Sequence, residues 1–489
     1  MILLIISQIN KIIWFQYSST GCLTCHKTPI LKMNDSTYIL GSLHYNNNRL
    51  RIMLMGIKVK TGITVEWYKA WLSNPDLNLD VSTLTKINDT LIAVGGGHGG
   101  CGNNQSCSFF GLFNLKTQNF VWAKYLSSKA IVNSIAYDGN SLVLAVQGYD
   151  ANSQGAIIKT DLNGNVIWAK QTSFGCSYND NYIIIPESNG YVVMGIGWWC
   201  SNWQPVIYRI SLDGSSATLI KGISNNYRAY NLIKDGDGNY VLIGFYEPDG
   251  GAYLSKIGPS GNVIYSKRYT ANNGFRFYNI TLDLDGNYLL SGVTKIGSTD
   301  YPIAAKINKS DGSVIWARRW SGAPADQAHN QAKGIIPVKP GKILVSGYLG
   351  TSVDNHNGFI VILDSIDCMT SFQVNVNDFA LSNWSPSISL SNYSGISNLT
   401  LTPYNFSISQ TASCSVVPIS DNEYKSCNYI IYGSKGFIAI KSENEVNLKI
   451  FSISGYKVKE VNIKEGKIKI NPGIYIVQIG KDKVKIIVK

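Results

Sequence analysis

The feature that most constrains the fold of this chain is a repeated unit in which a run of apolar residues ends at glycine. The unit recurs about every fifty residues, and its glycines are Gly41, Gly95, Gly148, Gly195, Gly244, Gly292 and Gly347. In the clearest copy, residues 278–320, short strands are separated by Asp-Gly turns and a longer loop. An aromatic residue recurs in the fourth strand, as Trp14, Trp67, Trp122, Trp168, Tyr265 and Trp316. Repeats of this kind predict the blades of a β-propeller.

The number of repeats predicts how the ring closes. Seven glycine-terminated hairpins predict seven blades in an all-β fold, and an eighth blade would need a further hairpin upstream. Leu3–Tyr17 matches the last two strands of a blade, so we expect it to complete the blade that begins with Ala332–Gly347. Phe359–Leu363 is then a surplus strand. In the alternative arrangement Phe359–Leu363 is the third strand of that blade, and only Ile12–Tyr17 is added from the N-terminus.

Composition and charge exclude several classes of protein. The 489 residues are 45% apolar, which supports sizeable cores. From residue 430 onward there are twelve Lys and five acidic residues, so this segment carries +7 of the formal net charge of +12. The repeats are nearly balanced, and a nucleic-acid groove is not expected because backbone binding needs clustered Lys and Arg. No run approaches the roughly 20 apolar residues of a transmembrane helix. Met1–Ser7 is a poor signal peptide, so any leader is expected upstream of this sequence.

Two changes of composition predict the domain boundaries. Residues 1–366 form the expected propeller. Residues 367–429 are rich in Ser, Asn and Thr, and their short alternating runs suggest a β-rich spacer rather than a packed blade. Residues 430–489 change again, to alternating Lys and Ile.

The last of these segments has a distinctive order of strands and turns. The order is Leu448–Phe451, the Ser454-Gly455 turn, Tyr456–Val461, Pro472–Val477 and the basic end Lys483–Lys489. It resembles the type A C-terminal sorting domain of the type IX secretion system. The resemblance implies a small β-sandwich that is read during export and often removed, with secretion and surface-attachment machinery as partners and an extracellular or cell-surface location. An ordinary immunoglobulin-like tail domain is the alternative.

The loops predict which face of the propeller binds a ligand. Tight turns such as Asp237-Gly238-Asn239 join the first strand of a blade to the second and the third to the fourth, so the longer loops emerge on the opposite face. Loops held by a rigid scaffold commonly carry function. We expect a glycan or a surface protein to bind there through Trp198, Trp199, Trp203, His98, Tyr246, Tyr348, His329 and His356. Packing of the aromatic residues between neighbouring blades is the alternative explanation.

A short cysteine motif raises the question of a cofactor. Cys22-Leu23-Thr24-Cys25-His26 fits the CxxCH pattern of c-type haem attachment, in which two thiols bind the porphyrin and the histidine binds the iron. Zinc bound by Cys22, Cys25 and His26 would need a further ligand, and the second ligand pair usual in such sites is missing. We therefore expect no cofactor, and an extracellular c-type haem redox protein is the alternative function.

The other cysteines suit disulfides, because an exported protein meets an oxidising compartment. Nearness in the sequence suggests three pairs among the nine cysteines: Cys101 with Cys107, Cys176 with Cys200, and Cys414 with Cys427. Connectivity does not follow from the sequence, so the pairs remain hypotheses.

Enzyme motifs are weak in this chain. There is no Ser-Gly nucleophile elbow and no HExxH, and paired aspartates such as Asp235 and Asp237 are explained by tight turns. The function that we expect is therefore that of a secreted or cell-surface binding protein. A propeller hydrolase or lyase is a further alternative, because propellers can build sites from scattered residues.

Overall fold

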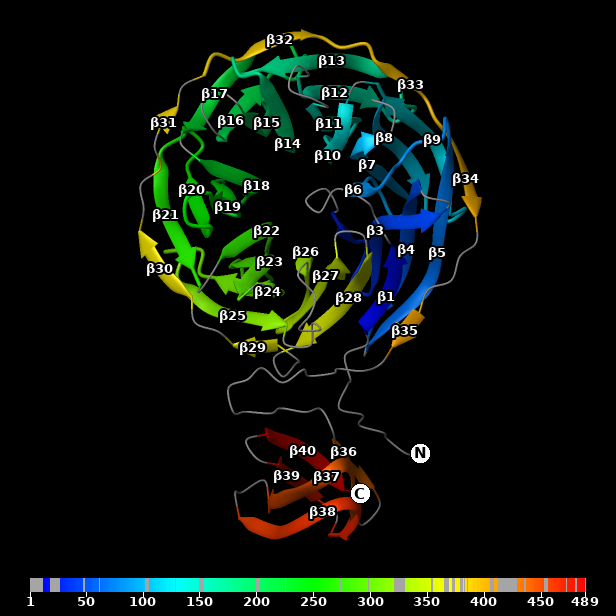
Figure 1. The fold of residues 1–489 in the computed structure, drawn as a ribbon, viewed down its shortest axis with the longest axis vertical. Helices are drawn as coiled ribbons and strands as arrows, with labels where there is room; N and C mark the ends of the chain where they lie inside the picture. The colour runs from blue at the N-terminus through cyan, green and yellow to red at the C-terminus, as the bar shows by residue number, and fades with distance from the viewer. Residues whose placement is uncertain are drawn as a thin grey trace. The chain divides into compact units, whose positions relative to one another are not determined.

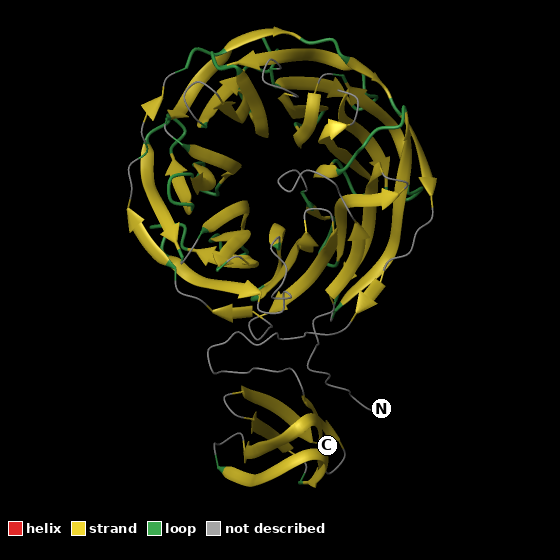
Figure 2. Ribbon diagram, viewed as in Figure 1, coloured by secondary structure: helices red, strands yellow, loops and turns green. Residues whose placement is uncertain are grey.

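The computed structural model shows an all-β protein, with no helix among the residues that it describes (Figure 1, Figure 2). Those residues are 12–17, 27–46, 49–60, 62–101, 105–127, 129–148, 154–198, 203–224, 226–271, 274–297, 299–320, 330–352, 355–364, 369–371, 374–378, 381, 383–384, 386–404, 409–411, 429–434, 437–452, 456–471, 473–479 and 482–488. Within these ranges no helix is long and apolar enough to cross a membrane. Ile12–Thr411 form one compact unit, and the C-terminal strands belong to a second.

Seven sheets arranged around a ring form the blades, which confirms the propeller (Figure 1). Blade 1 contains β2 (Ile30–Lys32), β3 (Thr37–Asn46), β4 (Arg49–Val59) and β5 (Ile63–Asn74). Blade 2 contains β6 (Val81–Lys86), β7 (Leu91–Cys101), β8 (Gln105–Asn114) and β9 (Asn119–Leu126). Blade 3 contains β10 (Lys129–Tyr137), β11 (Ser141–Gly148), β12 (Ala156–Asp161) and β13 (Val166–Ser173). Blade 4 contains β14 (Tyr178–Glu187), β15 (Gly190–Trp198), β16 (Gln204–Ile210) and β17 (Ala217–Ile223). Blade 5 contains β18 (Tyr227–Lys234), β19 (Tyr240–Tyr246), β20 (Gly251–Ile257) and β21 (Val263–Thr270). Blade 6 contains β22 (Phe275–Leu282), β23 (Tyr288–Ile296), β24 (Thr299–Ile307) and β25 (Val314–Trp320). In each of these blades the first strand lies nearest the centre of the ring (Figure 1).

Blade 7 closes the ring with strands from both ends of the propeller sequence. It contains β26 (Gln331–Lys339), β27 (Lys342–Ser352), β28 (Asn355–Asp364) and, as its fourth strand, β1 (Ile12–Tyr17). Strands β1 and β28 are antiparallel, with Ile12 opposite Val361 and Tyr17 opposite His356. The alternative arrangement is therefore the observed one, because Phe359–Leu363 lie in the third strand. Residues 1–11, which include the rest of the expected N-terminal hairpin, lie outside the described residues.

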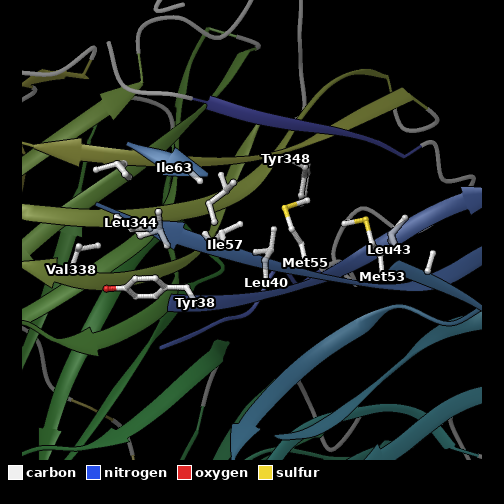
Figure 3. Close-up of a cluster of buried hydrophobic side chains, with 14 of the residues drawn as sticks. Tyr38, Leu40, Leu43, Met53, Met55, Ile57, Ile63, Val338, Leu344 and Tyr348 are labelled. Atoms are coloured by element: carbon white, nitrogen blue, oxygen red, sulfur yellow. The ribbon is translucent and has the colours of Figure 1, made fainter. Parts of the chain in front are cut away.

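The closing seam between blades 7 and 1 is packed by apolar side chains. Leu344 and Tyr348 of blade 7 contact a buried cluster that includes Tyr38, Leu40 and Met55 of blade 1 (Figure 3). Burying these side chains stabilises the junction of the two chain ends by the hydrophobic effect.

The segment expected to be a spacer adds an outer strand to every blade, and we call residues 369–411 the belt. Its strands are β29 (Met369–Ser371), β30 (Asn375–Asp378), β31 (Asn383–Trp384), β32 (Ser389–Asn392), β33 (Ile396–Asn398), β34 (Thr400–Tyr404) and β35 (Ser409–Thr411). They pair with the fourth strands of blades 6, 5, 4, 3, 2, 1 and 7 in that order, so the belt runs around the ring against the order of the blades (Figure 1). Leu399 of the belt is buried in the core. The belt thus covers the outer sheet edges that a four-stranded blade would leave unpaired.

The aromatic residue of the fourth strand joins neighbouring blades. Trp168 of blade 3 donates a hydrogen bond of 3.1 Å from Nε1 to the carbonyl oxygen of Leu212, in the third-to-fourth-strand turn of blade 4. Trp122 makes the same contact one blade earlier, at 2.9 Å to Leu162. The turn glycine Gly214 lies directly against the Trp168 ring and has a φ of +69°. The recurrence of aromatic residues and Asp-Gly turns in the sequence is explained by this contact.

The C-terminal unit contains β36 (Tyr429–Ser434), β37 (Phe437–Ser452), β38 (Lys457–Lys469), β39 (Gly473–Ile479) and β40 (Asp482–Val488). The long strand β37 pairs with β36 through its first half and with β39 through its second half, while β38 pairs along both halves. Leu448, Ile450 and Ile468 are buried in this unit. The strands expected from the sequence within residues 448–489 are present, and a sorting role for them remains a prediction.

Candidate functional site

The first strands of the blades share a β-bulge close to the end where the longer loops emerge, which we call the long-loop end. In blade 5 the register between β18 and β19 shifts between Ala229 and Asn231, and in blade 6 it shifts at the same place between Phe277 and Asn279. Six blades have this shift, and the extra residues are Ser82, Asn133, Tyr182, Tyr230, Tyr278 and Lys333. All six are polar. Bulges re-aim side chains and are frequent beside functional sites, so this level of the ring is the candidate site.

A stack of aromatic rings and arginines links blades 4, 5 and 6 at this end. The guanidinium carbon of Arg228 lies 4.0 Å from the ring centroid of Trp203 and 5.6 Å from that of Phe245. Arg276 is the equivalent residue one blade later. Its guanidinium carbon lies 4.3 Å from the centroid of the same Phe245 ring. Cations over aromatic faces attract the ring quadrupole, and the attraction grows as water is excluded.

A second row of contacts continues to blade 7. The rings of Tyr230 and Tyr278 meet edge to face at a centroid distance of 5.0 Å. Lys333 Nζ lies 3.3 Å from the centroid of the Tyr278 ring, and the residue is only 8% exposed. We name the whole set the cation–aromatic arc: Trp203, Arg228, Tyr230, Phe245, Arg276, Tyr278 and Lys333. It spans four blades, with five of its residues on innermost strands, Phe245 on β19 and Trp203 beside β16.

A further lysine approaches the same level from blade 1. Lys27 lies just before β2, yet its Nζ donates hydrogen bonds to the carbonyl oxygen and Oδ1 of Asn133 in blade 3, at 3.3 and 3.1 Å. The side chain therefore reaches past blade 2 on the inner side of the ring. Burial lowers the pKa of Lys27 to about 8, and the opposing effect of Asp80 is smaller.

Positive charge exceeds negative charge in the arc. Arg228 Nε forms an ion pair of 2.6 Å with Glu247. Among the described residues, no carboxylate forms an ion pair with Arg276 or Lys333, and Asp300 acts on both only through a longer-range Coulombic attraction. Burial, followed by repulsion from Arg276 and Lys27, holds the pKa of Lys333 well below its usual value. Burial also raises the pKa of Tyr278, so its hydroxyl stays protonated.

Three of the predicted aromatic residues can be placed. Trp203 lies in the arc, where the Arg228 guanidinium packs over its ring. Tyr246, at the end of β19, packs against Tyr227 at a centroid distance of 4.9 Å and lies 5.8 Å from Arg268. Tyr348 is fully buried in the closing seam, where the packing explanation applies. The rings thus carry cations or are buried, and they do not form a bare platform.

Only the backbone is described for several other predicted residues. Trp198 ends β15, His98 lies in β7 opposite Cys107, and His356 lies in β28. Cys101 also lies in β7, opposite Gln105 rather than Cys107. Trp199 and His329 lie outside the described residues, as do Cys414 and Cys427.

The cofactor and disulfide hypotheses are tested only in part. Cys22, Cys25 and His26 lie outside the described residues, so the haem and zinc hypotheses on them stay predictions. No cluster of three or more His, Cys, Asp or Glu that could hold a metal occurs in the described ranges. Cys176 is buried and disulfide-bonded, while its expected partner Cys200 lies outside those ranges, so the pairing also stays a prediction.

The charged residues of the arc are not among the predicted site residues, although the sequence contains a signal for them. Tyr-Arg-Ala-Tyr-Asn at 227–231 and Phe-Arg-Phe-Tyr-Asn at 275–279 repeat an Arg-x-Tyr-Asn pattern at the start of two consecutive first strands. Arg228 and Arg276 are the arginines of this pattern, and Tyr230 and Tyr278 are its bulge residues. A polar residue repeated where an apolar innermost strand is expected is the kind of departure that marks a site.

Comparison with known proteins finds only distant structural similarity. No protein-family model matches the chain, and no curated protein sequence matches it either. Among solved structures, a candidate 6-phosphogluconolactonase from Bacteroides fragilis is 11% identical with a TM-score of 0.42, covering 74% of this chain and 100% of that one. The periplasmic gluconolactonase of Pseudomonas aeruginosa is 11% identical with a TM-score of 0.39, covering 79% and 99%. An oligogalacturonate lyase in complex with manganese is 11% identical with a TM-score of 0.42, covering 72% and 97%. This chain is an all-β protein built around a seven-bladed β-propeller.

Proposed function

We propose that this protein is an exported β-propeller binding protein that recognises an acidic glycan through the cation–aromatic arc. The observation that carries the proposal is the arc itself: three cations and four aromatic rings on the first two strands of blades 5 to 7 and beside β16 of blade 4, with one carboxylate partner among the described residues. Function on the long-loop end is also what the distribution of loops predicts.

The chemistry of the arc suits a ligand that is both anionic and rich in hydroxyl groups. Guanidinium groups form paired hydrogen bonds with carboxylate and sulfate oxygens. The protonated hydroxyl of Tyr278 is a donor for sugar oxygens. A neutral glycan would leave the excess positive charge of Arg276 and Lys333 without compensation, so we expect acidic sugars to be preferred.

Export of the protein is the part of the proposal that rests on the C-terminal unit. Its strands β37 to β40 include the residues that resemble a type IX sorting domain. Deleting residues 430–489 should keep the protein inside the native host, while the propeller still folds. Fusing the same residues to an unrelated exported reporter should direct that reporter to the cell surface or the medium. Normal export of the shortened chain would refute this part.

Glycan binding can be measured directly with the purified protein. We expect it to bind immobilised polygalacturonate or chondroitin sulfate, but not neutral arabinan, in surface plasmon resonance. Arg276→Gln should weaken the affinity about tenfold or more, because a hydrogen bond between charged groups contributes roughly 1.5–3 kcal/mol. Arg318→Gln is the matched control, since Arg318 also lies over an aromatic ring, Trp316 at 5.5 Å, but on the outer strand β25 of the same blade. Equal binding of neutral and acidic polymers, or no binding of either, would refute the proposal. Product release in the same assay would point to the hydrolase or lyase alternative instead.

A further inference from the structure

Three cations on or beside the innermost strands form no ion pair with a carboxylate among the described residues, and one of them, Lys333, is buried. Lys333 comes from blade 7, Arg276 from blade 6 and Lys27 from blade 1, so the three belong to consecutive blades around the closing seam. None of the three forms an ion pair with a carboxylate among the described residues, whereas Arg228 is paired with Glu247. Burying like charges near one another without a counter-ion is unfavourable.

The geometry holds these groups in place. Lys333 and Tyr278 are both extra residues of β-bulges, which turn them away from the regular alternation of β26 and β22. Lys333 Nζ lies 3.3 Å from the centroid of the Tyr278 ring, and the Arg276 guanidinium lies 4.3 Å from that of the Phe245 ring. Lys27 is held from the other side by its two hydrogen bonds to Asn133. Each cation therefore has its own contact: Tyr278 for Lys333, Phe245 for Arg276 and Asn133 for Lys27.

The charged groups around Lys333 favour an anion as the missing partner. Arg276 and Lys27 both act on Lys333 by Coulombic repulsion, and the attraction of Asp300 is the weakest of these effects. An oxyanion would be attracted by all three cations and would also accept a hydrogen bond from the Tyr278 hydroxyl. A metal cation would be repelled, and a neutral group would leave the charges uncompensated.

We infer that Lys333, Arg276 and Lys27 form an oxyanion subsite at the inner side of the ring, for one carboxylate, sulfate or phosphate group. The subsite rests on the proposed glycan-binding function, since it lies at the blade 7 end of the cation–aromatic arc. The oxyanion has two sources with the same chemistry: an acidic sugar unit of the glycan or a free small anion. Binding of the oxyanion replaces repulsion between the cations with attraction and stabilises the folded state.

Thermal unfolding of the full chain tests the subsite. Inorganic phosphate, sulfate and galacturonate monosaccharide should each raise the Tm more than sodium chloride of the same ionic strength. Lys333→Met should abolish this difference and weaken anion affinity at least about tenfold, a change of about 1.4 kcal/mol. Without added anion the variant should melt at the same temperature as the native protein or higher, because it removes a buried charge. A purely structural lysine would give the opposite result, a lower Tm with the anion response retained.

Two controls keep the outcomes distinct. Lys342→Met removes another buried lysine of blade 7, in β27, and should leave the anion response unchanged. If Lys333→Met does not fold, acetylation of Lys333 in the native protein provides a second measurement. Phosphate should slow this acetylation, as followed by peptide mass spectrometry.

Equal stabilisation by phosphate and chloride, or no protection of Lys333, would overturn the subsite. Galacturonate binding at Lys333 without polymer binding would refute the glycan function and leave the subsite standing. Polymer binding that is unchanged in Lys333→Met would refute the subsite and leave the glycan function standing.

Discussion

The Tyr288 hydroxyl of blade 6 donates a hydrogen bond of 3.0 Å to Oδ2 of Asp235 in blade 5. The same carboxylate oxygen forms an ion pair of 2.9 Å with Lys256 from the third strand of its own blade. The arrangement recurs one blade earlier, where Tyr240 donates a hydrogen bond of 2.8 Å to Glu187, and Glu187 is paired with Arg209. Tyr191 and Asp138 make the contact between blades 4 and 3, at 2.7 Å. A tyrosine, a carboxylate and a cation therefore join neighbouring blades near the tight-turn end.

Removing one tyrosine hydroxyl should measure what this contact contributes. Tyr288→Phe is expected to lower the free energy of unfolding by about 1–2 kcal/mol, because the buried Asp235 loses a hydrogen bond to its charged form. Tyr38→Phe is the matched control. Tyr38 occupies the equivalent place in blade 1, opposite Ile57 as Tyr288 is opposite Ile307, but its buried hydroxyl has no hydrogen-bond partner among the described residues. Urea unfolding should show little change for Tyr38→Phe, and equal losses for both variants would contradict the explanation.

The same carboxylate should make stability depend on pH. Burial alone would raise the pKa of Asp235, but hydrogen bonds from Lys256, Asn239 and Tyr288 outweigh it and lower the pKa below its usual value. The unfolded chain then binds the proton more tightly, so protonation favours unfolding. The contribution of Asp235 should be complete above about pH 4, the usual pKa of an aspartate, and should be lost as the pH falls through the folded-state pKa.

Asp235→Asn isolates this effect from that of the other acidic residues. The difference in urea midpoint between the native protein and Asp235→Asn should be constant from pH 7 to about pH 5 and should shrink below about pH 4. A difference that stays constant down to the lowest pH would show that the charge of Asp235 does not matter for stability.

Two turn glycines separate backbone strain from blade packing. Gly286→Ala places a side chain at a φ of +81° with nothing within 4 Å of the new Cβ, so it should cost about 1 kcal/mol of stability through conformation alone. Gly214→Ala has a similar φ of +69°, but its Cβ would lie 2.8 Å from the Trp168 ring. This variant should be clearly less stable than Gly286→Ala and should alter Trp168 fluorescence. Equal losses would mean that the contact between the turn and the tryptophan is not a close one.

The belt should be essential for the stability of the ring. A fragment of residues 12–411 keeps every belt strand and is expected to unfold cooperatively, because it is one compact unit. A fragment of residues 12–366 lacks the belt, and we expect a lower urea midpoint and faster proteolysis at the outer strands. Leu399→Ala tests the same contact with a point change and should cost about 2–5 kcal/mol, as large-to-small core substitutions do. Unchanged stability of the shorter fragment would show that the outer strands are dispensable.

The sequence predicts the blades well because their signal is local. Each glycine-terminated hairpin and each Asp-Gly turn is encoded within a few residues, so the number of blades and the direction of the strands follow from the pattern. The sequence allows two arrangements of the closing strand, because the pairing of Ile12 with Val361 depends on residues at opposite ends of the propeller.

The belt was harder to predict, since its strands take their partners from the blades rather than from one another. Its repeat is visible in retrospect as Leu-Ser-Asn at 381–383 and 390–392 and Ile-Ser-Asn at 396–398. Two of its asparagines accept hydrogen bonds from fourth-strand lysines, Asn392 from Lys170 at 2.9 Å and Asn398 from Lys124 at 3.4 Å. The cation–aromatic arc was missed for a related reason, because its residues come from four blades and only the three-dimensional ring brings them together.

The position of the belt in the chain determines when the molecule can be finished. A ribosome makes the seven blades first and residues 369–411 afterwards, so every blade exists for a time with its fourth strand as a free edge. Such edges invite pairing with other chains, and this risk lasts longest for the blades made earliest. Along the chain, the belt strands pair first with blade 6, then with blades 5, 4, 3, 2 and 1, and last with blade 7. Synthesis therefore reaches the end of the propeller before its edges are protected, and folding in the cell is expected to depend on keeping nascent chains apart until the last strand is in place.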